Sequence, residues 1–195
     1  MHTYDVDLFE FVARPTKGSL LVAAPQLTDP NFHRSVIFMV QHSPQGALGL
    51  IVNRPTEEEG FDRLEPWLRE LSEPAVIFAG GPVQTDALIA IGSVDPDLSS
   101  ELISPIIGGL SSLDVSQPPD ELLEGLRSLR IFRGYAGWGP GQLEDELEEG
   151  SWLVLTVQAD DVFTTHPQGL WRNVLRRTGG RKALLADAPD DLSWN

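Results

Sequence analysis

The histidine and serine side chains are the first candidates for catalysis or metal binding. None of the four histidines shows the paired spacing of a recognised zinc motif, and the Gly-x-Ser-x-Gly turn of many hydrolases is missing. A Ser-His-Asp triad can still assemble from residues far apart in the chain. The best candidate combination in this sequence is His42 with Asp29 and Ser35. A strand-end histidine whose ring caps a turn explains His42 more simply. We favour that interpretation and predict no catalytic set, no metal site and no cofactor.

A glycine-dense run from Gly134 to Gly141 lies between two apolar segments and leads into an acidic stretch. The order strand, glycine loop, helix, strand is the one that many phosphate sites use. Neither the P-loop pattern nor the dinucleotide-binding pattern is present. Glu144 and its acidic neighbours would each repel a phosphate by about 1 kcal/mol at 4 Å in water, whereas they stabilise a helix start. We predict a structural run that permits a tight strand-to-helix turn and close packing of Tyr135 and Trp138.

Four polar residues could form a small pocket if the glycine segments bring two loops together. Asn53 and Arg54 end one expected strand, and Gln142 and Glu144 open an expected helix. Arg54 could then pair with Glu144, while the two amides offer donors to a small ligand. The alternative is a buried structural pair that fixes loop geometry, which we favour because no nucleophile or metal accompanies it. A ligand-binding protein or enzyme using this pocket is our second functional hypothesis.

Composition restricts the class of protein. The 195 residues are 41% hydrophobic, enough for one compact domain with a sizeable core. No apolar run approaches the roughly 18 residues needed to cross a bilayer, and the first residues lack a basic segment followed by an apolar one. Zero cysteines exclude disulfides and thiolate chemistry and suit a reducing compartment. We expect a cytoplasmic protein that does not enter membranes.

The formal net charge is -15, from 29 acidic and 14 basic residues. Such a field repels nucleic acid. Segment 172–182 is the one candidate for binding nucleic acid despite this charge, because it carries arginines and a lysine and no acid. Arg176 and Arg177 fall in the last turn of an expected helix, where cations complement the carbonyl end of the helix dipole. We expect that structural role and no nucleic-acid binding.

Short strands and helices are expected around these groups. Apolar runs bounded by proline or glycine predict strands at 19–24, 35–40, 48–53, 75–79, 87–91, 103–107, 113–115, 129–132 and 152–157. The residues Ser43–Gly46 predict a hairpin turn. Three- and four-residue apolar spacing predicts helices at 61–71, with Pro66 in a first turn near Glu65, and at 119–129, 142–149 and 167–178. Because the expected strands and helices do not alternate regularly along the chain, we expect a mixed α+β fold.

Four segments together resemble the bacterial YqgE/AlgH family. The segments are Gly18–Pro25 through Asp29, Phe32 and Ser35; His42 through Gly46–Gly49 to Asn53–Pro55; Gly80, Gly81, Pro82 and Val83; and Gly134, Tyr135, Gly137 and Trp138 with Gly141–Leu143. They occur in family order from about Gly18 to Leu175, and the tail 191–195 resembles actinobacterial members. The resemblance implies a mainly antiparallel, bifurcated sheet folded into a pseudo-barrel with about four helices packed around it. Relatives usually carry a basic residue and then a histidine after the Gly80 motif, whereas 86–92 has neither.

Members of this family are described as uncharacterised proteins or candidate transcriptional regulators, and no catalytic set comes with the resemblance. We therefore expect a non-enzymatic interaction or regulatory protein with an unidentified protein partner, with room for a homo-oligomer. The expected organisation is an N-terminal segment at 1–17, one domain at 18–183 and a C-terminal tail at 184–195. Leu8, Phe9 and Phe11 are expected to pack back onto that domain.

Overall fold

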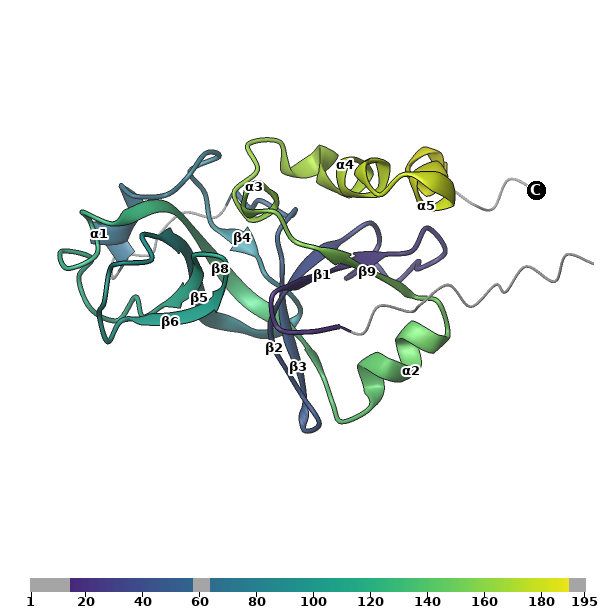
Figure 1. Cartoon of the computed structure of the whole chain (residues 1–195), viewed down its shortest axis with the longest axis horizontal. Helices are drawn as coiled ribbons and strands as arrows, with labels where there is room; N and C mark the ends of the chain where they lie inside the picture. Colours follow the sequence, from purple (N-terminus) through teal and green to yellow (C-terminus); the bar gives the residue numbers. More distant parts are fainter. Residues whose placement is uncertain (1–14, 58–63, 190–195) are drawn as a thin grey trace, which may run out of the picture.

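A nine-stranded, mostly antiparallel sheet forms the centre of the molecule (Figure 1). The structure is a computed structural model that describes residues 15–57 and 64–189. The strand order is β6-β7-β5-β8-β3-β2-β1-β9, with β4 parallel to β8. The strands are β1 Ser19–Ala23, β2 Val36–Ser43, β3 Gly46–Ile51, β4 Phe78–Ala79, β5 Val83–Val94, β6 Ile103–Ile107, β7 Leu110–Leu113, β8 Leu126–Trp138 and β9 Trp152–Thr156. The sheet curls into a half-barrel, which confirms the expected α+β fold.

The sheet forks where β3 and β8 part. Residues 47–49 pair with 136–138 in the shared region. Beyond it, the Ile51 N–H donates to the Gly80 carbonyl at 2.9 Å, and the Gly80 N–H donates to the Arg133 carbonyl at 2.8 Å. Gly80 therefore stands between two strands that were direct neighbours a few residues earlier. The long strand β8 joins both wings of the fork, because its first half pairs with β5 and its last residues pair with β3.

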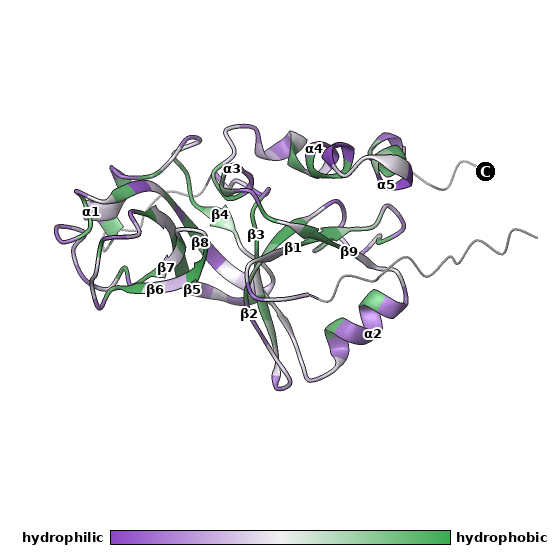
Figure 2. Ribbon diagram, viewed as in Figure 1, coloured by the Kyte–Doolittle hydropathy of each residue, from purple (hydrophilic) through white to green (hydrophobic). Residues whose placement is uncertain are grey.

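Two helices cover opposite faces of the β1–β2 wing (Figure 1). The helices are α1 Glu65–Leu68, α2 Gln142–Glu148, α3 Ala159–Val162, α4 Leu170–Arg177 and α5 Gly180–Leu184, with single 3-10 turns η2 Pro167–Gly169 and η3 Leu185–Asp187. As expected, α4 buries Leu170, Trp171, Val174 and Leu175. The Trp171 indole donates to the Ala23 carbonyl at 2.7 Å. On the other face α2 buries Leu143 and Leu147 and exposes Glu144, Asp145 and Glu148, which belong to the purple part of its ribbon in Figure 2.

The helix expected at 119–129 is wrong. Residues 119–125 form turns, and β8 begins at Leu126. The leucine spacing does not define one buried face, since Leu122 is fully buried whereas Leu123 is 43% exposed. Leu129 lies opposite Gly92 in the β5–β8 ladder. Pairing with β5 therefore decides the conformation, as tertiary contacts commonly override a weak local preference.

Several other boundaries also differ from expectation. The hairpin turn at Ser43–Gly46 is confirmed, but the strand expected at 87–91 is the middle of a longer β5, and the one expected at 113–115 is β7. Beyond residue 183, where the tail is expected to begin, η3 extends to Asp187 and Ala186 is fully buried. Of the N-terminal segment, residues 1–14 with their three apolar anchors lie outside the described residues, as does the start of the helix expected at 61–71. Within the described ranges, no helix is long and apolar enough to cross a membrane.

Candidate functional site at the β2–β3 hairpin

The tip of the β2–β3 hairpin extends past the rest of the sheet, beside α2 (Figure 1). Ser43 fixes its turn, because the hydroxyl donates to the Gly46 carbonyl at 3.3 Å and accepts from the Gln45 N–H at 3.3 Å. A Cβ on Gly46 would overlap the Trp138 carbonyl oxygen of β8. Glycine is therefore needed where the hairpin rests on β8. The turn is held both by its own hydrogen bonds and by the neighbouring strand.

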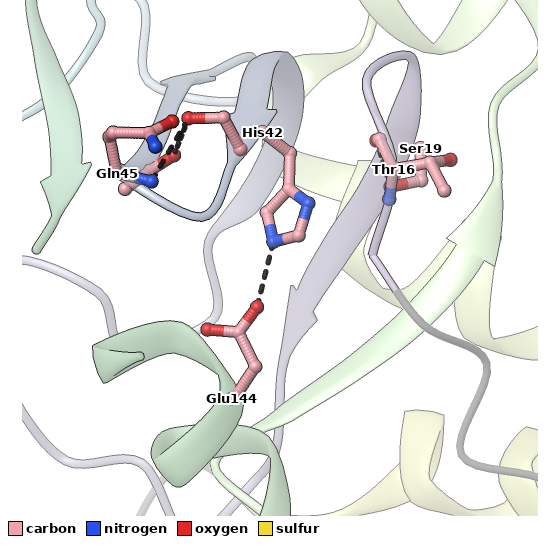
Figure 3. A network of polar contacts seen from close by, with 7 residues as sticks. Thr16, Ser19, His42, Gln45 and Glu144 are labelled. Atoms are coloured by element: carbon pink, nitrogen blue, oxygen red, sulfur yellow. Dashed lines mark hydrogen bonds and ion pairs between the residues drawn. The ribbon is translucent and has the colours of Figure 1, made fainter. Parts of the chain in front are cut away.

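His42 joins this hairpin to the first turn of α2 (Figure 3). Its Nε2 lies 2.9 Å from Glu144 Oε1, and the two side chains are 22% and 50% exposed. The pKa of Glu144 is lowered, first by a hydrogen bond from its own backbone N–H and then by His42. A hydrolytic triad consists of a nucleophilic hydroxyl, an imidazole and a carboxylate, and this pair has the last two groups. In the described part of the chain, no serine or threonine hydroxyl is hydrogen-bonded to the His42 ring, and the nearby Ser43 hydroxyl is used within the turn.

Two hollows flank the hairpin. One, of about 370 Å³, is lined by His42, Ser43, Pro44, Gly141 and Glu144. The other, which we call the hairpin hollow, has a volume of about 380 Å³. It is lined by Gln41, Ser43, Gln45, Gly46, Ala47, Leu48, Val83, Tyr135, Gly137 and Trp138. Among these described residues none is charged, in a chain of which 22% is charged. The hairpin hollow therefore offers apolar and aromatic surface surrounded by amides and hydroxyls.

The carboxylate of Glu146 anchors α2 to the strands behind the hairpin. It accepts the indole N–H of Trp138 at 2.9 Å and that of Trp152 at 2.8 Å through Oε2, and the amide of Gln142 at 2.9 Å through Oε1. The two tryptophan rings also pack edge to face, with centroids 5.9 Å apart. Sequence reasoning missed Glu146, although its i+4 spacing from Gln142 and the two flanking tryptophans were visible.

We expect Glu146→Ala to lower the free energy of unfolding by about 2 kcal/mol, because it leaves two partly buried indole N–H groups without their acceptor. Urea unfolding followed by tryptophan fluorescence measures the effect. Glu148→Ala is the matched control, since Glu148 is an exposed acid of the same helix and should change stability by less than about 0.5 kcal/mol. Equal losses in the two variants would mean that removing an acid from α2, and not the indole contacts, causes the effect.

The predicted polar pocket does not assemble. Glu144 pairs with His42 and not with Arg54. Arg54 donates to the His33 carbonyl at 3.2 Å, while Asn53 accepts the Val36 N–H and donates to the Arg34 carbonyl, each at 2.9 Å. The pKa of Arg54 is lowered by burial and partly restored by Asp29. Residues 53–54 lie at the far end of β3, roughly 20 Å along an extended chain from the hairpin tip. The other predicted member, Gln142, accepts the Gly139 N–H at 3.1 Å near the tip.

The triad combination of His42, Asp29 and Ser35 does not assemble either. Asp29 accepts the Asn31 N–H at 2.8 Å in a local turn. Ser35 is fully buried just before β2, whereas His42 lies seven residues further along that strand. An extended strand separates such positions by roughly 23 Å. His42 is a strand-end histidine, as predicted, but its ring bonds to a neighbouring helix and does not cap a turn.

Comparison with known proteins decides the family. A family model described as AlgH-like matches residues 20–183. The chain belongs to the AlgH-like family. It is 45% identical over 182 residues to a UPF0301 protein of Streptomyces coelicolor, covering 91% of this chain and 94% of that protein. A UPF0301 protein of Thermobifida fusca is 44% identical over 187 residues, with 91% and 94% covered.

Solved structures agree with this AlgH-like assignment. The crystal structure of a protein from Corynebacterium diphtheriae is similar with a TM-score of 0.86 at 25% identity, over 91% of this chain and 95% of that chain. The solution structure of the AlgH protein from Pseudomonas aeruginosa gives a TM-score of 0.66 at 32% identity, over 91% and 97%. The expected membership of this family, with its actinobacterial relatives, is therefore confirmed.

The glycine motifs of the AlgH-like chain lie at and beside the fork of the sheet. The segment from Gly134 to Trp138, expected as a loop, is part of strand β8. Gly139 and Gly141 lie in the strand-to-helix turn, where Gly141 is the N-cap of α2 with a φ of 76°. The Gly80, Gly81 and Pro82 segment runs against β8, where a Cβ on Gly81 would overlap the Tyr135 carbonyl. At Gly80, Gly81 and Gly134 the missing side chain permits close approach of two backbones.

The basic segment also has structural contacts in the AlgH-like fold. Arg176 pairs with Asp187 at 2.9 Å. Arg177 binds the buried Asp161 and also donates to the Thr156 carbonyl at 3.0 Å. Both arginines occupy the last turn of α4, as predicted. These contacts hold α3, α4 and η3 together at one end of the sheet.

Proposed function

We propose that this chain is a non-enzymatic interaction protein that binds a protein partner at the hairpin hollow. The observation that carries the proposal is the uncharged lining of that hollow in a protein of net charge -15. Centres of protein–protein interfaces are depleted in charge and enriched in tyrosine and tryptophan, which supply most of the binding energy. Tyr135 occupies this position here, with Leu48 and Val83 beside it, whereas the Trp138 side chain is buried against Glu146 and Trp152.

The polar groups that could otherwise do chemistry are already engaged in holding backbone segments. Asn53 joins β2 to the chain beyond β3, His42 joins the hairpin to α2, and Glu146 joins α2 to Trp138 and Trp152. Such contacts make the surface rigid, and in the described part of the chain no hydroxyl nucleophile is hydrogen-bonded to the His42–Glu144 pair. The geometry therefore supports the interaction hypothesis over an enzyme built on these residues.

The acidic charge and the family support a regulatory protein that acts on gene expression through proteins and not by contacting nucleic acid. A net charge of -15 opposes nucleic-acid binding at long range. A cytoplasmic location is consistent with the absence of cysteine from the sequence.

A second candidate function, small-ligand binding, is favoured by a groove of about 630 Å³ lined by η2 and by the segments around Pro55 and Pro74. Its lining includes Pro55, Pro74, Val76, His166 and Gln168. This volume falls in the range of small-molecule pockets. A ligand-binding function would therefore use this groove and not the four-residue pocket expected from the sequence.

Variant baits test whether a protein partner uses the hairpin hollow or the groove. The double variant Gln41→Arg with Gln45→Arg introduces two cations at exposed positions of the hairpin hollow without touching the core. Gln168→Arg is the matched control, because it makes the same change at an exposed position of the groove. In quantitative pull-downs from a bacterial lysate, we expect one protein to be retained by wild type and Gln168→Arg and to fall at least about tenfold with the hairpin variant. Loss with Gln168→Arg alone would move the site to the groove, and no variant-dependent protein would contradict the proposal.

A further inference from the structure

A single buried side chain fixes two walls of the groove at η2. The lining of this groove includes the segments around Pro55 and Pro74 and the turn η2. The buried Arg130 donates to the Glu73 carbonyl at 2.8 Å and to the Thr164 carbonyl at 3.3 Å, and each of these residues immediately precedes a lining segment. The groove is therefore shaped before any ligand enters, which lowers the ordering cost of binding.

Four polar side chains of the lining are not engaged within the protein. They belong to Glu57, Thr165, His166 and Gln168, and all four residues are exposed. Across residues 15–57 and 64–189, none of these side chains forms a hydrogen bond or an ion pair. The hairpin differs in this respect, because His42 is already bound to α2. The groove therefore combines a preformed shape with polar groups that are available to a ligand.

The charge of the lining is negative. Its one formal charge is the carboxylate of Glu57, with the histidine counted as neutral, and the exposed acid Glu73 directly precedes the lining residue Pro74. Arg130 has the opposite sign, but it is buried, is not part of the lining and is engaged with two carbonyls. In a chain of net charge -15, a cleft of this sign concentrates cations and repels anions.

The η2 wall does not reverse this preference. Helix starts bind anions through free backbone N–H groups. Here Pro167 has no N–H, and the Gly169 N–H donates to the His166 carbonyl at 3.1 Å. The side chains of Thr165, His166 and Gln168 each carry a hydrogen-bond acceptor: a hydroxyl oxygen, a neutral imidazole nitrogen and an amide oxygen. An ammonium group in the groove has three N–H donors for such acceptors.

We propose that the groove binds a small organic cation, namely a primary ammonium group attached to an apolar body. This inference rests on the second candidate function, small-ligand binding at the groove. The ammonium group pairs with Glu57, and the body packs on Pro55, Pro74, Val76 and Pro167. A metal ion suits the site less well, because it needs several anionic or imidazole ligands and the described residues contain no group of three. The volume of about 630 Å³ is sufficient for an aromatic amine.

Three probes that share a phenyl body and differ in charge test the sign of the site. They are phenethylamine, phenethyl alcohol and hydrocinnamate, titrated into isotope-labelled protein and followed by amide chemical shifts. The amine should produce saturable shifts at Thr56, Val76 and Gln168. We expect its dissociation constant to be at least about tenfold lower than that of the acid, with the alcohol between them. Added salt should weaken the binding of the amine and leave that of the alcohol unchanged.

Glu57→Gln separates the carboxylate in the groove from the net charge of the protein. The dissociation constant of the amine should rise about fivefold in this variant, because an ion pair is replaced by a neutral contact. Glu148→Gln is the matched control, since it makes the same change of charge at an exposed acid of α2 and should alter the constant by less than about twofold. Circular dichroism and thermal melts verify that both variants are folded.

The three probes also distinguish failure of this inference from failure of the ligand-binding function. If the acid or the alcohol binds in the groove as tightly as the amine, the proposed cation is wrong, whereas the groove remains a ligand site. Equal amine affinity in wild type and Glu57→Gln likewise overturns the proposal. If none of the probes shifts the groove amides at about 10 mM, the cation site and small-ligand binding at the groove are both overturned.

Discussion

Gly80→Ala will lower the free energy of unfolding by about 4 kcal/mol or more. The new Cβ would overlap the carbonyl oxygen of Gly134 and lie 3.0 Å from the Phe132 Cβ. These neighbours cannot move aside cheaply, because Gly80 is hydrogen-bonded on both sides, to Ile51 and to Arg133. The clash therefore opens the fork of the sheet. Urea unfolding monitored by tryptophan fluorescence measures the loss.

Gly141→Ala is the control for this prediction. Gly141 has a φ of 76°, but no atom lies within 4 Å of the position that its Cβ would take. The variant therefore loses only the conformational advantage of glycine, about 1 kcal/mol. If the variant at Gly80 is too unstable to purify, the soluble yields of the two variants give the same comparison. Similar losses at both positions would contradict the role assigned to the fork.

Arg130→Met will cost about 3 kcal/mol of stability, because Arg130 is a buried cation that ties two distant loops to β8. Its side chain is 1% exposed. The guanidinium lies 4.1 Å from the centroid of the Phe78 ring and donates to the carbonyls of Glu73 at 2.8 Å and Thr164 at 3.3 Å. Methionine keeps the apolar stem of the side chain but leaves both carbonyls without this donor. Methionine also avoids the cost of burying a charged guanidinium, but this gain offsets only part of that loss.

The pH dependence of this effect follows from the buried charge. Burial lowers the pKa of Arg130 to about 10, below the value in the unfolded chain. The folded state therefore releases this proton at lower pH than the unfolded state, so the cost of burying the charge is constant below about pH 9 and fades only as the pH rises above 10. The difference in stability between wild type and Arg130→Met should thus be flat between about pH 5 and 9.

Arg127→Met is the control for the buried arginine. Arg127 lies three residues away and is 65% exposed, with an ion pair to Asp95 at 2.9 Å. An exposed pair of this kind contributes little, and the variant should stay within about 0.5 kcal/mol of wild type. Guanidinium titrations of the three proteins at equal ionic strength test the prediction. A loss below about 1 kcal/mol in Arg130→Met would mean that the two loops hold their positions without this donor.

Local sequence patterns predicted the parts of the fold that depend on neighbours in the chain. The buried strands β1, β2 and β3, the turn at Ser43–Gly46 and the apolar face of α4 all follow from residue type and spacing within a few positions. The absence of the nucleotide fingerprints from the sequence favoured a structural purpose for the glycines. The family motifs carried the rest of the prediction, including the bifurcated sheet.

Only the tertiary structure decided the contacts between segments far apart in the chain. Pairing with β5 turned the leucine-rich start of β8 into a strand. Glu144 has His42 as its partner and not Arg54, because the direction of β3 takes residues 53–54 to the opposite end of the hairpin. The burial of Arg130 likewise depends on loops 57 and 34 residues away in sequence. Spacing along the chain encodes which face of an element is buried, whereas the choice of partner depends on which ends the whole sheet brings together.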